Sequence, residues 1–129
     1  GILAILCAMR GAAKVTAVEI DGFAIENARE NIALNGVSSA VSAIHGDASA
    51  LDALPEASQD IFLANINRNI ITADIAAYAR TLRSGGIMLL SGFYVADIPH
   101  IIEAASPLGL EQLSFDELDS WACLRLKKA

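Results

Sequence analysis

Short apolar runs alternate along the chain with longer segments whose apolar residues recur every three or four positions. The runs are rich in Val, Ile and Leu and predict strands, whereas the spaced segments predict helices. The expected strands of the main part are 15–20, 41–44, 61–64 and 87–91. The expected helices are 2–9, 70–82 and 96–105, one between Asp21 and Asn35, and a short helical segment near 48–54. This strand and helix rhythm predicts an α/β fold with a parallel, doubly wound sheet.

The last part of the chain follows a different pattern. Segments 110–115 and 121–126 read as two strands, and the link 116–120 between them is too short for a parallel crossover. They are therefore expected to pair as an antiparallel hairpin at the end of the sheet. No repeat, low-complexity run or linker interrupts residues 1–129, so the sequence predicts one domain.

Composition limits the kinds of protein that fit. The 129 residues are 54% hydrophobic but only 5% aromatic, which suits the aliphatic strands of a parallel sheet. No apolar stretch reaches the roughly 20 residues that cross a bilayer, so no membrane span is expected. Cys7 and Cys123 lie far apart and form no CxxC pair. They are expected to be buried free thiols in a reducing compartment, the cytoplasm, and no metal site is predicted.

Charge narrows the choice of partners. The formal net charge is −6, and only Lys127 and Lys128 cluster among the basic residues. Phosphate contacts require clustered Lys and Arg, so direct nucleic-acid binding is not expected. An acidic surface favours a basic partner, although solubility explains the same charge.

Polar residues follow the predicted strands at the points where the strands end. Glu19 closes the first strand and is followed by Ile20 and Asp21, Asp47 comes after the second strand, and Asn65 ends the third. A carboxylate at a strand end that opens a helix is how nucleotide-binding α/β folds hold a ribose. Because carboxyl ends of parallel strands share one edge of the sheet, we expect Glu19, Asp47 and Asn65 to line one cleft.

Several short strings in a fixed order carry a more specific resemblance. They are Gly1-Ile2-Leu3-Ala4, Glu19-Ile20-Asp21, Ala28-Arg29-Glu30-Asn31, Leu34-Asn35-Gly36, Gly46-Asp47, Ala64-Asn65-Ile66 and Ser91-Gly92-Phe93. With the terminal hairpin, the whole chain resembles the class I S-adenosylmethionine-dependent methyltransferases, and among them the ribosomal-protein L-eleven methyltransferases (PrmA type). The resemblance implies an enzyme that transfers methyl groups from S-adenosylmethionine to amino groups, a Lys side chain or the N-terminus, of a basic large-subunit ribosomal protein.

The resemblance also implies roles for the cofactor side of the site. Gly1 would be the last glycine of the cofactor loop, about 20 residues before the ribose-binding acid. Glu19 would accept hydrogen bonds from both ribose hydroxyls, and Ile20 would pack on the adenine. Asp47 would accept the adenine amino hydrogen while the Ala48 amide faces a ring nitrogen. The structural alternatives are a solvated acid at Glu19 and a turn cap at Asp47.

For the amine side, Asn65 stands where amino-directed relatives carry an Asn/Asp-Pro-Pro-aromatic motif. Its side chain and the following carbonyl would accept hydrogen bonds from the target nitrogen, or its amide would merely close a turn. The resemblance also places Asn65 among the cofactor-binding residues. Ile66 and Asn67 replace the prolines, which favours an aliphatic amine over a planar base. Phe93 and Tyr94 are expected to border this pocket or to pack at the sheet edge.

Other polar residues near the strand ends have simpler expected roles. Asp21 is expected to cap the following helix. Asn67, Arg68 and Asn69 extend the rim or cap the next helix, and His45 has no catalytic role.

Members of this family carry a first strand and a complete glycine loop ahead of the position of Gly1, and a separate N-terminal domain. The sequence as given starts after them, so we expect the sheet to be interrupted where that strand belongs.

Three alternative functions stay open at this point. One is a methyltransferase that acts on RNA or a small molecule. The second is a nicotinamide-binding Rossmann domain, for which Glu19 is also suitable but a terminal hairpin is unusual. The third is a fragment that keeps the fold and binds nothing.

Overall fold

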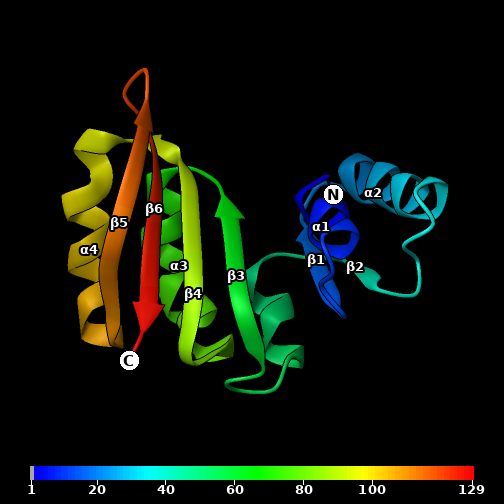
Figure 1. The fold of residues 1–129 in the computed structure, drawn as a ribbon, viewed down its shortest axis with the longest axis horizontal. Coiled ribbons are helices and arrows are strands. Elements are labelled where there is room, and N and C mark those ends of the chain that lie inside the picture. Colours follow the sequence, from blue (N-terminus) through cyan, green and yellow to red (C-terminus); the bar gives the residue numbers. More distant parts are fainter. Residues whose placement is uncertain (1) are drawn as a thin grey trace. The chain divides into compact units, whose positions relative to one another are not determined.

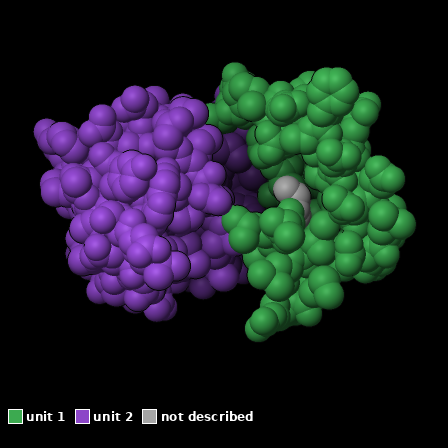
Figure 2. All heavy atoms as spheres, turned by 90° about the horizontal axis from the view of Figure 1, so that it is seen from above, with its two compact units in different colours: residues 1–50 green, residues 51–129 purple. Residues whose placement is uncertain are grey.

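The computed structural model describes residues 2–129, which fall into two compact units, residues 1–50 and 51–129 (Figure 2). Gly1 lies outside the described residues, so its predicted place in a cofactor loop is not addressed. The single domain expected from the sequence stays a prediction.

Unit 1 is a parallel pair of strands with two helices. Its elements are α1 (Ile2–Met9), β1 (Val15–Glu19), α2 (Gly22–Leu34) and β2 (Val41–His45), with η1 (Ala48–Ala53) beginning at its end. β1 and β2 pair in register from Val15 opposite Val41 to Glu19 opposite His45. Ile5, Ile32 and Val41 form a small buried core to which both helices and β2 contribute.

The limits of α2 follow from its terminal residues. The Asp21 side chain accepts hydrogen bonds from the backbone N–H groups of Phe23 (2.8 Å) and Ala24 (3.4 Å), which have no acceptor inside the helix. Asn35 caps the other end, and Gly36 follows with φ of +68°, a conformation that glycine adopts without strain. The predicted cap and stop of this helix are confirmed.

Unit 2 is a four-stranded sheet in the order β3, β4, β6, β5. Figure 1 shows α3 and α4 on one face of this sheet. Its elements are β3 (Gln59–Asn65), α3 (Arg68–Thr81), β4 (Leu82–Tyr94), η2 (Val95–Asp97), α4 (Ile98–Ala105), η3 (Ser106–Leu108), β5 (Leu110–Leu118) and β6 (Trp121–Lys128). β3 and β4 are parallel, and β6 is antiparallel to both β4 and β5. The predicted terminal hairpin is confirmed.

The strands therefore form two hydrogen-bonded sheets and not one continuous sheet. Within residues 2–129, β1 pairs only with β2, and β3 pairs only with β4 and has no second partner. This agrees with the expected interruption of the sheet.

β4 is longer than the sequence indicated. The strand that was expected over 87–91 begins instead at Leu82, directly after α3, and Ser84, Gly85 and Gly86 lie inside it as an irregularity. Gln59 pairs with Leu82 and Ile61 with Ile87, so the extra residues of β4 bulge out between these two pairs, and Gly85 takes φ of +79°. The two glycines indicate a break in regular pairing. They do not indicate that β4 is paired with β3 both before and after this break.

Alternation along β6 decides which side chains are in the core. Ala122, Leu124 and Leu126 are buried, whereas Cys123 and Arg125 are exposed. Successive side chains of a strand point to opposite faces, and only one face of this sheet is covered by α3 and α4. The prediction that both cysteines are buried is therefore wrong: Cys123 is exposed and Cys7 is partly exposed.

The alternation gives a matched test of the core. Leu124→Ala should lower the free energy of unfolding by about 2–5 kcal/mol, because it leaves a cavity among fully buried side chains. Cys123→Ala, one residue away on the exposed face, should change it by less than about 0.5 kcal/mol. Urea denaturation followed by circular dichroism measures both. Equal losses in the two variants would contradict the assignment of the two faces.

Candidate functional site

The ends of β1 and β2 bring two predicted residues to one edge of unit 1. The last pair of the ladder is Glu19 opposite His45, and the Gly46 N–H donates to the Glu19 carbonyl at 2.9 Å. His45 Nε2 donates to the Ile20 carbonyl at 2.9 Å. Glu19 and Asp47 therefore follow adjacent strand ends, and His45 has a structural role.

Glu19 and Ile20 present different groups at this edge. Glu19 is partly buried, and its Oε1 accepts a long hydrogen bond of 3.3 Å from the Asp21 N–H. Within residues 2–129 its second oxygen, Oε2, has no hydrogen-bond partner. The Ile20 side chain is 69% exposed beside it. A carboxylate oxygen next to an exposed apolar side chain can accept from a hydroxyl while the apolar group covers a planar ring.

Asp47 caps the turn into η1, as its structural alternative predicted. One oxygen, Oδ1, accepts hydrogen bonds from the Ser49 hydroxyl and, at 2.9 Å, from the Ser49 backbone N–H. These two hydrogen bonds hold the pKa of Asp47 below its ordinary value, and the bond from the hydroxyl has the larger effect. The other oxygen makes no bond to the described part of the chain. Ala48 is the first residue of η1, where N–H groups lack acceptors inside the helix.

In unit 2, three asparagines stand close together at and just after the end of β3, and only one of them has a side chain without a hydrogen-bond partner in the described chain. Asn67 is the N-cap of α3, with its Oδ1 accepting from the Ile70 N–H at 3.0 Å. Asn69 Oδ1 accepts a hydrogen bond from Arg68 at 3.4 Å. Asn65 is exposed, and its amide has no hydrogen-bond partner among residues 2–129. Of the three, Asn65 is thus the one whose side chain is available to a ligand.

A bulge in β4 faces Asn65. Ser91 pairs with Cys123 and Phe93 with Ala122, so Gly92 between them has no partner on β6. The extra residue shifts the alternation of side chains by one position, which places Phe93 on the covered face after Met88 and Leu90. Phe93 is only 2% exposed, which favours the alternative that its side chain packs in the protein rather than borders a pocket.

Tyr94 behaves differently from Phe93. It is 50% exposed and stacks on Trp121 of the neighbouring strand, with ring centroids 4.3 Å apart. Its backbone N–H donates to Asp97 Oδ2 at 3.0 Å, and Asp97 Oδ1 lies 3.3 Å from Arg68 Nη1. The ion pair thus connects the segment after β3 with the segment after β4.

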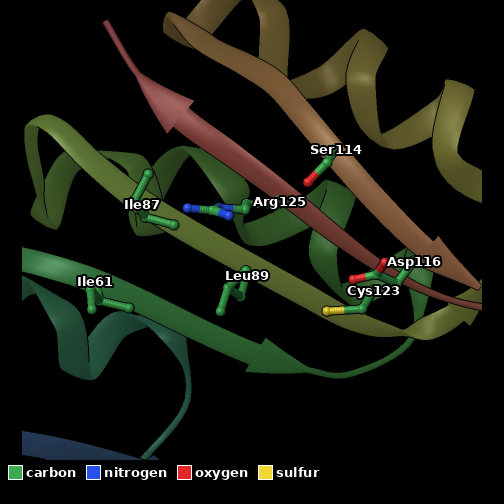
Figure 3. A pocket seen from close by; sticks show the side chains of 7 residues that line it. All are labelled: Ile61, Ile87, Leu89, Ser114, Asp116, Cys123 and Arg125. Carbon is green, nitrogen blue, oxygen red and sulfur yellow. The ribbon is translucent and has the colours of Figure 1, made fainter.

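A separate hollow lies on the face of the unit 2 sheet that α3 and α4 leave uncovered (Figure 3). The residues that line it are Ile61, Ile87, Leu89, Ser114, Asp116, Cys123 and Arg125. None of the residues predicted from the sequence to bind a cofactor or substrate lines it, so it is not the predicted site.

The structure brings Glu19, Ile20, Asp47 and Ala48 together at one edge of unit 1, and it places Asn65 beside Gly92 in unit 2. The convergence of all three polar residues on one cleft stays a prediction. Sequence reasoning missed two residues, Ser49 and Gly92. The signal for Ser49 was its position two residues after an aspartate, a common turn pattern. The signal for Gly92 was a glycine inside an apolar strand.

Among residues 2–129, no three His, Cys, Asp or Glu side chains lie where they could hold a metal ion. None of the helices in the same range combines the length and apolarity that crossing a membrane requires.

Comparison with solved structures identifies the class of fold. The ribosomal protein L11 methylase from Lactobacillus delbrueckii subsp. bulgaricus superimposes with a TM-score of 0.89 and 27% identity, over 100% of this chain and 66% of that one. The TYW2 protein of M. jannaschii, solved in complex with AdoMet, shares the fold at a TM-score of 0.75 and 16% identity, over 100% and 65% of the two chains. The chain has the Rossmann-like methyltransferase fold with a C-terminal antiparallel hairpin.

Sequence comparison then identifies the family. The family model "Ribosomal protein L11 methyltransferase (PrmA)" matches residues 1–129, and the chain belongs to this family. The ribosomal protein L11 methyltransferase of Porphyromonas gingivalis is 47% identical over 125 residues, which are 97% of this chain and 42% of that protein. The protein of the same name from Phocaeicola vulgatus is 43% identical, over 96% of this chain and 43% of its own length. The chain thus spans less than half the length of these relatives.

The turn at Asp47 gives a test of the local electrostatics. Ser49→Ala should raise the pKa of Asp47 toward its ordinary value, because the hydroxyl donor that stabilises the carboxylate is lost. Since the folded pKa is lowered, the stabilising effect is present above the ordinary pKa and disappears as the pH falls through the lowered one. Carboxyl NMR titration measures the shift. Ser39→Ala, in the loop before β2, is the control and should leave the Asp47 titration unchanged.

Proposed function

We propose that this protein is an S-adenosylmethionine-dependent methyltransferase that methylates amino groups of ribosomal protein L11. The observation that carries the proposal is the unused acceptor at Asn65, in a chain that belongs to the L11 methyltransferase family over its whole length. The relatives' names point to the same substrate.

The edge of unit 1 fits the adenosine part of the cofactor. Glu19 Oε2 and Asp47 Oδ2 are acceptors without partners in the described chain, and ribose hydroxyls and an adenine amino group are donors. The Ala48 N–H is a donor for a ring nitrogen, and the exposed Ile20 side chain offers an apolar surface for the purine. The donor and acceptor set is thus complementary to a nucleoside.

The end of β3 fits the amine. Asn65 Oδ1 and the Ile66 carbonyl are both acceptors, and they lie near each other: a β-carbon built on Gly92 would be 2.9 Å from the first and 2.8 Å from the second. Two acceptors of this kind orient the lone pair of an amine by holding its hydrogens. Ile66 and Asn67 stand where base-directed relatives carry prolines, and this replacement favours an aliphatic amine over a planar base amine.

When bound, S-adenosylmethionine supplies a methyl group on a positively charged sulfur. An amine held at Asn65 and the Ile66 carbonyl would attack that methyl carbon; the electron pair of the broken C–S bond would stay on sulfur, and the alkylated nitrogen would release a proton. A free lysine amine has a pKa of about 10.4 and is mostly protonated at neutral pH. The amine would first lose this proton to solvent, and Asn65 Oδ1 and the Ile66 carbonyl would then hold its remaining hydrogens so that the lone pair is oriented.

The direct test is methyl transfer from radiolabelled S-adenosylmethionine by the full-length gene product that contains residues 1–129. Label should enter purified ribosomal protein L11 and not ribosomal RNA or free nucleosides. Mass spectrometry of the labelled protein identifies the modified amino groups. Label in RNA alone would contradict the proposal and favour the alternative that the enzyme methylates RNA.

Cofactor binding tests Glu19. Glu19→Ala should weaken S-adenosylmethionine binding about tenfold or more, because a hydrogen bond to a charged group contributes on the order of 1.5–3 kcal/mol. Glu26→Ala removes an exposed acid of α2 and is the matched control, which should bind within about twofold of the unchanged protein. Isothermal titration calorimetry measures both. Equal affinities in the two variants would remove Glu19 from the site.

Asn65 should act on the transfer step. Asn65→Ala should lower kcat about 100-fold, as loss of alignment at the reacting atoms does, and leave cofactor affinity within about twofold. Asn69→Ala removes a nearby amide and is the control. A loss of cofactor affinity that matches the loss of kcat would assign Asn65 to cofactor binding instead.

A further inference from the structure

We infer that Gly92 is a positioning residue: the absence of a side chain at this bulge fixes both amine acceptors, Asn65 Oδ1 and the Ile66 carbonyl, in place. The inference rests on the proposed function, because it concerns the geometry of the same acceptors. The family resemblance includes Gly92 in a short matching segment but implies no role for it.

The first observation is the crowding at this position. A β-carbon on Gly92 would lie 2.7 Å from the Ile66 nitrogen, 2.8 Å from the Ile66 oxygen and 2.9 Å from Asn65 Oδ1. Real β-carbons essentially never come within 3.0 Å of such atoms. Two of the three atoms belong to the backbone, so a rotamer change cannot relieve the overlap. Any side chain at position 92 must therefore displace the Ile66 peptide.

The second observation is that the Ile66 segment is tied to β4 and to the segment that follows β4. The Ile66 N–H donates to the Ser91 carbonyl at 2.8 Å, just after the last parallel pair of β3 and β4. Two residues further on, Arg68 is tied to Asp97 across the ends of the same two strands. The peptide cannot move away from position 92 without losing one of these interactions.

The third observation is the backbone of Gly92 itself. Its φ is +94°, and it is the unpaired residue of the bulge between Ser91 and Phe93. Glycine adopts this conformation without the penalty that a β-carbon brings. Because Phe93 returns to the buried face immediately afterwards, the core fixes the position of the bulge. Core packing thus presses position 92 against the acceptors.

A β-carbon at Gly92 would cause both backbone strain and crowding, and Gly109 allows the two effects to be separated. It lies in the same unit with φ of +78°, and the nearest atom to an added β-carbon is Ala129 Cβ at 4.0 Å. Gly109→Ala therefore introduces similar backbone strain with no crowding. It is the matched control for Gly92→Ala.

The experiment compares the two variants in the full-length gene product. Gly92→Ala should lower kcat for methyl transfer into L11 about 100-fold, since displacing reacting groups by about 1 Å has this effect, and leave cofactor affinity within about twofold. Gly109→Ala should keep kcat within about threefold. Equal kcat values in the two variants, with an active unchanged protein, would overturn the positioning role and leave the proposed function intact. An unchanged protein that transfers no methyl group to L11 would overturn the proposed function, and the positioning role with it.

A double-variant cycle tests the link to Asn65. In the Asn65→Ala background one of the crowded atoms is gone, so Gly92→Ala should cost a smaller factor in kcat than it does alone. If Gly92→Ala lowered kcat by the same factor with and without Asn65→Ala, the proposal would be contradicted. Thermal unfolding reports whether Gly92→Ala folds, and Gly92→Asn replaces it if it does not, because Asn tolerates positive φ better than Ala. Unfolding of both variants would assign Gly92 a purely structural role.

Discussion

The parallel pairing of β1 with β2 and of β3 with β4 is the constraint on which the rest of the structure depends. The two parallel ladders finish at Glu19 opposite His45 and at Asn65 opposite Ser91, and β4 itself continues to Tyr94. The chain must then leave the sheet, and α2 and α3 begin within three residues of these ends. Polar side chains at this level are beyond the core, so they keep their hydrogen-bonding capacity without a desolvation cost.

The same segments must also start helices. Neighbouring residues therefore divide two roles: one residue caps the helix, and another keeps a free hydrogen-bond acceptor. Asp21 and Asn67 cap α2 and α3, whereas Glu19 and Asn65, each two residues earlier, keep acceptors that the described chain does not use. Asp47 combines the two roles: one of its oxygens accepts hydrogen bonds from Ser49 and caps the turn, and the other stays free in the described chain. An acceptor that the described chain leaves unused is thus retained beside each cap.

The bulge at Gly92 connects this edge with the interior of unit 2. The alternation that buries Met88 and Leu90 would expose Phe93, and one extra residue returns its ring to the core. That residue then lies against Asn65 and Ile66. Packing of the core and placement of the acceptors therefore depend on one backbone irregularity, which explains why a glycine is needed there.

The local sequence determined the elements and their ends, because periodicity, caps and stops are properties of neighbouring residues. It was sufficient for the order of strands and helices, the cap at Asp21, the terminal hairpin and the choice of Glu19, Asp47 and Asn65 as candidates. The exposure of Cys123, the burial of Phe93 and the extension of β4 back to Leu82 required the tertiary structure. Each depends on which residue of another strand lies opposite and on which face the helices cover. Such contacts join residues far apart in the chain, and no local pattern encodes them.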